Sequence, residues 1–184
     1  MLDLFDKIQE SVAFIQSKWS QTPKAGIILG TGLGSLVEKI DVAVSIDYAD
    51  IPHFPQSTAI SHKGQLVCGT LNGLPVIAME GRIHMYEGYP LKEITLPVRV
   101  MKALGADLLV CSNAVGGLNP YFSEGDIMLI EDQINLMGDN PLIGINDDRL
   151  GPRFPDMCEP YCHQLIERAL RIARAQDIVA HQGV

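Results

Sequence analysis

The chain has 184 residues, 47% hydrophobic and 20% charged, a composition typical of a soluble globular protein with a sizeable core. Its 14 basic and 22 acidic residues give a net charge of −8, which disfavours nucleic acid and anionic membranes as partners. No apolar run approaches the roughly 20 residues that span a bilayer, and the N-terminus lacks the pattern of a signal peptide, so we expect a cytoplasmic protein.

Four cysteines are few for a disulfide scaffold of this length, and we expect them to be reduced. Cys158, Cys162 and His163 lie close together in the sequence, but they form no CxxC pair and no second pair follows. We therefore expect no metal site here and interpret these residues as core or surface positions.

In the first quarter of the chain, apolar residues recur at helical spacing over residues 5–19 and predict an amphipathic helix. The apolar run 25–29 predicts a buried strand. It leads directly into the glycine-rich segment 30–35, and residues 33–40 are compatible with a short helix.

The middle of the chain carries a hairpin signal. Residues 66–71 and 74–79 flank Asn72-Gly73, the dipeptide most typical of a two-residue hairpin turn. Apolar spacing then predicts a helix that stops at Gly105, with Pro97 making its start uncertain.

Two further strands are expected at residues 108–111, as a buried strand, and at residues 127–130. A long irregular stretch covers roughly residues 135–160, and residues 165–173 have the spacing of an amphipathic helix. Another strand is expected after that helix, where the chain stops. Strands that alternate with helices predict an α/β fold, and the hairpin argues against an entirely parallel sheet.

The segment Gly30–Gly34 follows a predicted strand, where its backbone N–H groups can approach an anion. A tight turn without a ligand is an equally good interpretation. A dinucleotide-binding domain is disfavoured because Ser35 stands where the fingerprint needs a third glycine.

Arg82 and His84 point to the same side if the chain is extended between them, and both residue types bind phosphate. His62 and the loop 113–117 are further candidates, although each is also compatible with an ordinary surface loop. No nucleophile elbow, HExxH motif or recognisable carboxylate pair occurs. These features suit chemistry in which a bound anion itself attacks the substrate.

Taken together, the motifs from about residue 25 to residue 160 resemble the trimeric purine nucleoside phosphorylases in order and spacing, and the run Gly81–Pro90 is very specific. The segments that carry the resemblance are residues 30–34, 51–64, 80–90, 97–99, 113–119, 125–128, 132–136 and 153–157.

The resemblance implies one α/β domain over residues 1–184 with a central mixed, partly barrel-like sheet flanked by helices, incomplete at the C-terminus. It implies phosphorolysis of the N-glycosidic bond of purine nucleosides, with inorganic phosphate as co-substrate and no metal or organic cofactor. Arg82 and His84 would be catalytic. The implied phosphate site consists of Thr31, His62, Arg82, Ile83, His84 and Ala114.

The resemblance also implies that Tyr86 lies against the ribose and that Phe154 reaches the site of a neighbouring subunit in a homotrimer. Thr31 replaces a family serine, and Val115 replaces the more usual alanine. The family's purine-reading Glu and Asn, a second phosphate-binding Ser and a ribose-contacting His would all lie beyond Val184, so the base preference stays open. Two alternatives remain: a methylthioadenosine phosphorylase, disfavoured by the loop 113–119, and a non-catalytic fragment of the enzyme.

Overall fold

The computed structural model describes residues 3–30, 32–57 and 63–184. It divides into two compact units, Met1–Ala114 and Val115–Val184. Each unit is described separately below.

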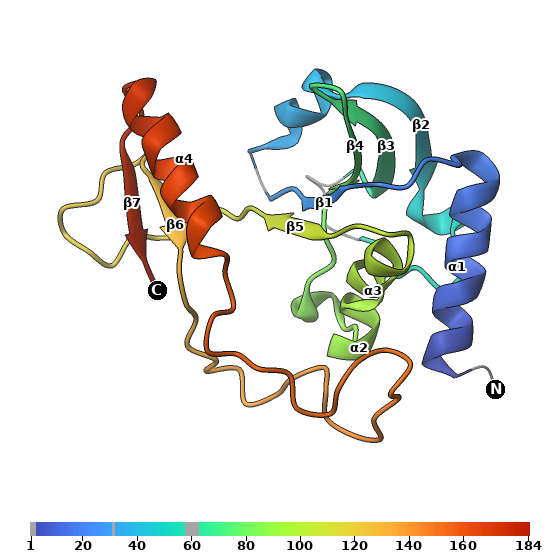
Figure 1. The fold of residues 1–184 in the computed structure, drawn as a ribbon. Helices are drawn as coiled ribbons and strands as arrows, with labels where there is room; N and C mark the ends of the chain where they lie inside the picture. Colours follow the sequence, from blue (N-terminus) through green and yellow to red (C-terminus); the bar gives the residue numbers. More distant parts are fainter. Residues whose placement is uncertain (1–2, 31, 58–62) are drawn as a thin grey trace. The chain divides into compact units, whose positions relative to one another are not determined.

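The first unit is built on a five-stranded mixed sheet with the strand order β2-β3-β4-β1-β5 (Figure 1). Its strands are β1 (Ala25–Ile28), β2 (Asp41–Asp47), β3 (Gln65–Leu71), β4 (Leu74–Glu80) and β5 (Leu108–Cys111). Strand β1 runs parallel to both β4 and β5, whereas β3 is antiparallel to β2 and β4. The predicted α/β class and mixed sheet are confirmed.

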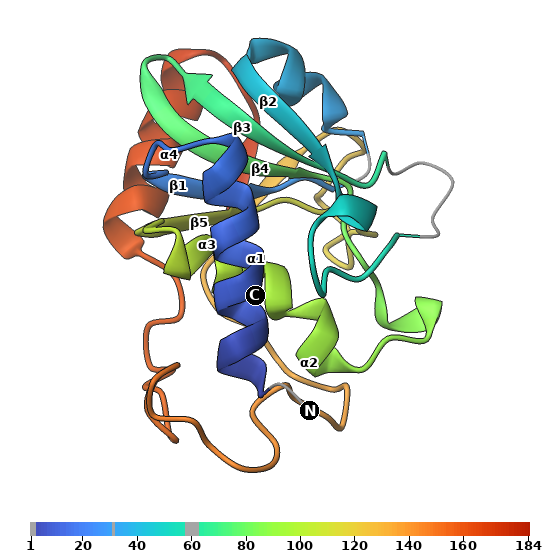
Figure 2. The ribbon, with the colours of Figure 1, turned by 90° about the vertical axis from the view of Figure 1, so that its right-hand side faces the viewer.

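Helices of this unit are α1 (Leu4–Lys18), α2 (Leu91–Ile94) and α3 (Leu96–Ala103), and its 3₁₀ helices are η1 (Gly34–Lys39), η2 (Tyr48–Asp50) and η3 (Met85–Glu87). Helix α1 packs on α3, and α3 packs against β1 (Figures 1 and 2). On the other side, η1 packs against β4. In the described part of the chain, no helix is long and apolar enough to cross a membrane.

Both faces of the central strands are buried, because alternate side chains point to opposite faces of a sheet. Ala25 and Ile27 of β1 join Val76 and Ala78 of β4 in one apolar cluster, against which the side chains of η1 pack. Gly26 faces the other way, where a Cβ atom would lie 2.7 Å from the Sδ atom of Met101 on α3. This absence of a side chain brings α3 close to the sheet.

The hairpin forms where Asn72-Gly73 predicts it. Asn72 and Gly73 have φ angles of 50° and 79°, and Leu71 pairs with Leu74 across the turn. Positive φ at both central residues is what a type I′ turn requires, and these two residue types tolerate it best.

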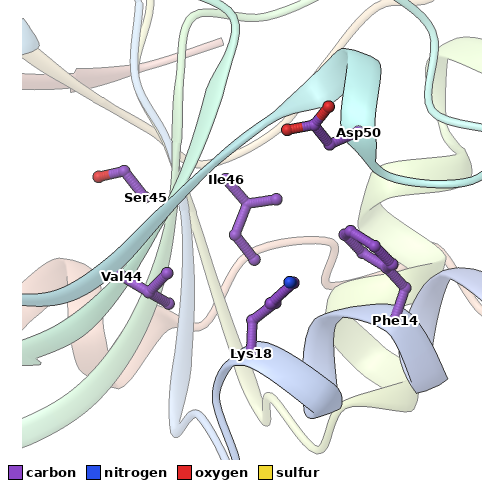
Figure 3. Close-up of a pocket in the computed structure, with 6 residues that line it drawn as sticks. All are labelled: Phe14, Lys18, Val44, Ser45, Ile46 and Asp50. Atoms are coloured by element: carbon purple, nitrogen blue, oxygen red, sulfur yellow. The ribbon is translucent and has the colours of Figure 1, made fainter.

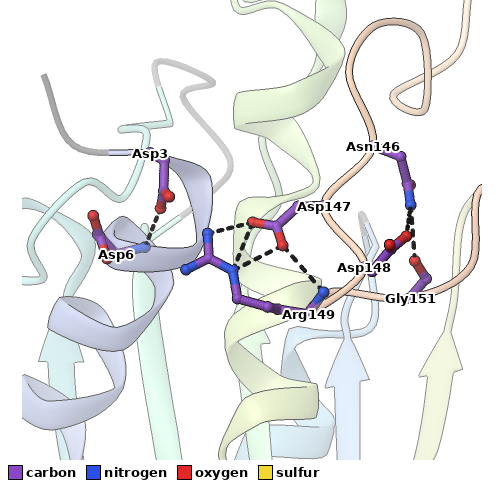
Figure 4. Close-up of polar contacts among 7 residues, drawn as sticks. All are labelled: Asp3, Asp6, Asn146, Asp147, Asp148, Arg149 and Gly151. Carbon is purple, nitrogen blue, oxygen red and sulfur yellow. Dashed lines mark hydrogen bonds and ion pairs between the residues drawn. The ribbon is translucent and has the colours of Figure 1, made fainter.

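Helix boundaries follow local chemistry. The Asp3 side chain accepts a hydrogen bond of 2.8 Å from the Asp6 backbone N–H and so caps α1 (Figure 4). Pro97 lies in the first turn of α3, where a missing N–H costs nothing. The short helix expected over residues 33–40 is a 3₁₀ helix.

Two strands differ from expectation. Strand β2 was not predicted, although Val42, Val44 and Ile46 alternate with less apolar neighbours. Strand β5 was expected to be buried, but it lies at the edge of the sheet, and Leu109 and Val110 are 43% and 45% exposed. An apolar run alone does not distinguish an edge strand from a central one.

The second unit contains a two-stranded parallel sheet of β6 (Ile127–Ile130) and β7 (Ala180–Gly183), with α4 (His163–Ala175) packed against β7. The strand expected after the last helix is therefore already present as β7. The chain between β6 and α4 is irregular, as predicted, and is held by local polar contacts. In one of them the Asp147 carboxylate accepts hydrogen bonds from the Arg149 guanidinium (Figure 4).

Candidate functional site

Three loops of the first unit meet at the end of its sheet where three parallel strands finish. Strands β4, β1 and β5 are mutually parallel, so the segments that follow Glu80, Ile28 and Cys111 all leave the sheet at the same end. Loops at this end are where ligands bind in α/β folds. The predicted site residues Arg82 and Ala114 lie on two of these segments.

Gly30 is the point of closest approach between these loops. A Cβ atom at this position would lie 2.5 Å from the Ser112 carbonyl oxygen, 2.6 Å from the Arg82 Nη2 atom and 2.8 Å from the Asn113 Cα atom. The Gly30 N–H donates a 3.0 Å hydrogen bond to the Ser112 hydroxyl, and Ser112 Oγ in turn lies 3.3 Å from the Ile28 carbonyl oxygen. Only glycine fits here, and its place brings the Arg82 guanidinium over the ends of β1 and β5.

Arg82 is half-buried. Burial lowers the pKa of its guanidinium, and interaction with the Cys111 thiol partly opposes this effect. An arginine remains charged in proteins even so. A charge that has lost part of its water gains more from a bound anion, and the guanidinium fork matches phosphate oxygens.

Ile83 and His84 continue this segment. Ile83 is buried at 4% exposure and belongs to the core, which leaves its backbone as its only polar contribution. His84 is half-buried, and its Nδ1 atom lies 3.1 Å from the Glu87 Oε1 atom. The same carboxylate oxygen accepts a 2.7 Å hydrogen bond from the His84 backbone N–H. Since an ionised carboxylate only accepts, Glu87 favours the tautomer of His84 with its proton on Nδ1.

Glu87 is the residue that sequence reasoning missed. Its side chain is only 1% exposed. The available signal was its spacing, because a Glu three residues after the residue that precedes a helix commonly reaches back to that residue's N–H. His84 stands in that position before η3.

Tyr86 stacks on His84, with ring centroids 4.7 Å apart and an interplanar angle of 16°. The tyrosine is 77% exposed, so its ring presents a flat apolar surface beside the imidazole. Ala114, the last residue of the first unit, is exposed. Thr31 and His62 lie outside the described residues.

Phe154 belongs to the second unit and is 85% exposed. The neighbouring Arg153 guanidinium carbon lies 5.7 Å from its ring centroid. Arg153 also donates hydrogen bonds to the carbonyl oxygens of Leu142 and Gly144, so it ties this part of the irregular stretch together.

A separate hollow of about 450 Å³ lies between α1 and the region of β2 and η2 (Figure 3). Lys18 and Phe14 of α1 line it, and the Lys18 ammonium lies 5.7 Å from the Phe14 ring centroid. None of the predicted site residues lines this hollow, and it offers one cation and one carboxylate, Asp50, without a convergent polar set.

Comparison with known proteins gives one consistent result. A family model described as the phosphorylase superfamily matches residues 24–184. Purine nucleoside phosphorylase 1 of Bacillus subtilis is 51% identical over 179 residues, which cover 97% of this chain and 66% of the relative. The purine nucleoside phosphorylase of Bos taurus is 48% identical over 168 residues, covering 90% of this chain and 58% of the relative. The chain therefore spans two thirds or less of the length of these curated relatives.

Solved structures agree. A purine nucleoside phosphorylase in complex with ribose-1-phosphate superposes with a TM-score of 0.93 at 40% identity, covering 100% of this chain and 70% of the other. Isoform 2 of the Schistosoma mansoni enzyme, in complex with cytosine and ribose-1-phosphate, gives a TM-score of 0.89 at 41% identity, covering 97% of this chain and 64% of the other.

Proposed function

Because this chain belongs to the phosphorylase superfamily, and within it to the purine nucleoside phosphorylases, we propose that the natural protein containing it cleaves purine nucleosides with phosphate. The products are a free purine base and ribose 1-phosphate or deoxyribose 1-phosphate. The observation that carries the proposal is the meeting of the Arg82 guanidinium with the Gly30 and Ser112 loops at the carboxyl ends of parallel strands.

The reaction we propose is a displacement at C1′ of the ribose. A phosphate oxygen forms a bond to C1′ while the bond from C1′ to the purine nitrogen breaks and its electron pair leaves with the base. Arg82 neutralises and orients the phosphate, and His84, held by Glu87, donates a second contact. Thr31, His62 and the backbone at Ile83 and Ala114 complete the proposed phosphate site. Positioning and charge stabilisation of this kind account for much of enzymatic catalysis.

We further propose that Tyr86 binds the ribose and that the protein assembles as a homotrimer in which Phe154 contacts the nucleoside in a neighbouring subunit. High exposure of both aromatic side chains supports this proposal, since each is available for contact. Solved relatives bound to adenosine and to hypoxanthine support a purine nucleoside as the ligand class.

We also propose that residues 1–184 form the larger part of a single phosphorylase domain whose C-terminal part lies beyond Val184. Coverage of 66% and 58% of the curated relatives supports this view. The cytoplasm is the proposed location, where the exposed thiols of Cys111, Cys158 and Cys162 would stay reduced.

The test is phosphate-dependent release of hypoxanthine from inosine by the natural protein and by its Arg82→Ala variant. Loss of a charge-assisted contact of ~1.5–3 kcal/mol weakens phosphate binding roughly 10- to 150-fold. Lys102→Met, at an exposed position of α3, is the control and leaves the phosphate dependence unchanged. Phosphate binding by Arg82→Ala as tight as that of the unmodified protein would show that the site is misassigned.

A further inference from the structure

A buried carboxylate stands at the end of β4, close in the chain to the proposed phosphate site. Glu80 is the last residue of β4 and is 7% exposed. Val76 and Ala78 precede it on the same face of the strand, and both belong to an apolar cluster. A carboxylate at the end of such a face is costly unless another group compensates its charge.

Lys63 is the group that compensates it. The Lys63 Nζ atom lies 2.7 Å from the Glu80 Oε1 atom, although the lysine side chain itself is 68% exposed. The hydrogen bond to Glu80, and then the charge of Glu80, raise the pKa of the Lys63 ammonium, and Glu38 adds to this effect. Removal of the Lys63 ammonium would therefore take away the cation that lies against the Glu80 carboxylate.

The backbone around this ion pair is tied at several points. The Gly64 N–H donates to the Glu80 carbonyl oxygen at 3.1 Å, and the Tyr48 N–H donates to the Gly64 carbonyl oxygen at 2.9 Å. The Tyr48 hydroxyl donates to the Gly81 carbonyl oxygen at 2.7 Å, and Tyr48 is itself 1% exposed. These bonds hold the backbone at Glu80 and Gly81, next to the point where the Lys63 ammonium contacts the Glu80 carboxylate.

Arg82 follows Glu80 by two residues, with Gly81 at a φ of 101° between them. The direction in which the chain leaves β4 therefore sets the position of the Arg82 Cα atom, from which the side chain extends. In addition, an uncompensated negative charge at Glu80, two residues from Arg82, would oppose the binding of an anion at Arg82.

We propose that Lys63 supports phosphate binding at Arg82 by cancelling the charge of the buried Glu80 carboxylate, while the backbone hydrogen bonds at Glu80 and Gly81 fix the end of β4. This inference rests on the proposed phosphorolysis. It concerns two residues that act through Arg82 and do not touch the reacting atoms.

The experiment compares Lys63→Met, Glu80→Gln and the double variant in the natural protein. For each, the KM for phosphate, the KM for inosine, kcat and the thermal midpoint are measured. Lys102→Met is the matched control, because Lys102 also forms an ion pair, with Asp107 at 3.8 Å, but both side chains are about three-quarters exposed. The control removes the same charge from the same unit of the molecule.

Lys63→Met is expected to raise the phosphate KM about three- to tenfold with little change in kcat or in the inosine KM. Glu80→Gln added to Lys63→Met restores the phosphate KM to within about twofold of the original value, because the uncompensated charge is then gone. The control leaves all three constants unchanged.

Two results would overturn the inference while leaving the function intact. One is a Lys63→Met variant that loses thermal stability but keeps the phosphate KM, which would make the pair merely structural. The other is a double variant no better than Lys63→Met in phosphate KM. An unmodified protein that shows no phosphate-dependent cleavage would instead overturn the proposed function, and the inference with it.

Discussion

The two units of the molecule differ in how many of their apolar side chains are buried. The first unit buries apolar side chains of both its helices and its sheet, and at 1% exposure or less these include Ile8, Ile15, Ile77 and Val100. Among the described residues of the second unit, only Ile166 and Ala173 are buried hydrophobics. A unit of this size with so little core gains little stability from its own folding.

Exposed apolar residues are instead numerous in the second unit. The large ones that are more than 70% exposed are Val115, Leu118, Tyr121, Ile134, Leu136, Ile145 and Phe154. So many exposed apolar side chains in a unit with so little core are typical of a region that another surface covers. The difference therefore suggests that the first unit carries its own stability and that the second depends on contacts made outside itself.

The largest effect is expected when residues 1–184 are produced alone. We expect no phosphorolytic activity, and we expect proteases to cut the irregular chain between β6 and α4 before they cut the first unit. The natural protein, treated in parallel, should be active and resist cutting in the same region. The measurements are inosine cleavage and the masses of the early proteolytic fragments. If residues 1–184 alone turned over inosine as fast as the natural protein, the second unit would not depend on contacts outside itself.

A substitution in the first unit tests whether the close packing of its loops at Gly30 is needed for stability and phosphate binding. Gly30→Ala would place a Cβ atom 2.5 Å from the Ser112 carbonyl oxygen, so we expect it to destabilise the protein by ~1–3 kcal/mol and to weaken phosphate binding. Gly34→Ala is the matched control, since nothing lies within 4 Å of its Cβ position. Urea unfolding and phosphate titration of both variants decide the matter. Equal behaviour of the two would mean that the loops at Gly30 can move apart freely.

The Phe154→Ala variant tests whether Phe154, on the exposed surface of the second unit, contacts the nucleoside bound in a neighbouring subunit. We expect the KM for inosine to rise about three- to tenfold while the phosphate KM stays the same, because the aromatic contact would be to the nucleoside. Tyr121→Ala removes an aromatic of similar exposure and should leave both constants unchanged. Light scattering at micromolar concentration should give the mass of a trimer. A monomer of full activity would contradict the assignment.

The smallest effect concerns a polar clamp in the second unit. Asp126 accepts a hydrogen bond from the Ser123 N–H and lies 2.8 Å from the His181 Nε2 atom; these contacts hold its pKa below the ordinary value of 3.8. A pKa lowered on folding stabilises the folded state above the unfolded-state value, and this contribution is lost as the pH falls through the folded-state value.

Thermal midpoints of the unmodified protein and Asp126→Asn should therefore differ by a constant amount above about pH 5 and converge as the pH falls below 4. Glu124→Gln removes a neighbouring exposed carboxylate and should show no such convergence. If the difference between the two thermal midpoints did not change down to pH 3, the ionised Asp126 carboxylate would not stabilise the folded state.

Sequence patterns predicted elements well wherever the local chemistry was decisive. The Asn72-Gly73 turn, the strand 127–130 and the first helix all lie where the spacing placed them. Patterns failed where the tertiary setting decides. The apolar residues of β5 are compatible with a central strand, and only the strand order shows that they form an edge.

The same limit applies to the candidate site. Arg82 and His84 stand out by residue type, and Glu87 could have been found from its spacing to His84, whereas Ser112 becomes visible only through its contact with Gly30. Lys63 lies just before β3 and Glu80 ends β4, so no spacing along the chain would reveal their ion pair. The roles assigned to Arg82, His84 and Tyr86 stay predictions until the variants are measured.

The β3–β4 hairpin turn has a practical consequence for handling the protein. Asn72-Gly73 lies at the opposite end of β4 from Arg82, a separation of roughly 20 Å along the strand. Nothing lies within 4 Å of the Cβ position of Gly73, and Leu74 beside it is exposed. A fluorescent label, affinity peptide or surface tether can therefore be inserted at this turn, so that ligand binding is followed by optical or sensor methods from a position remote from the reacting groups.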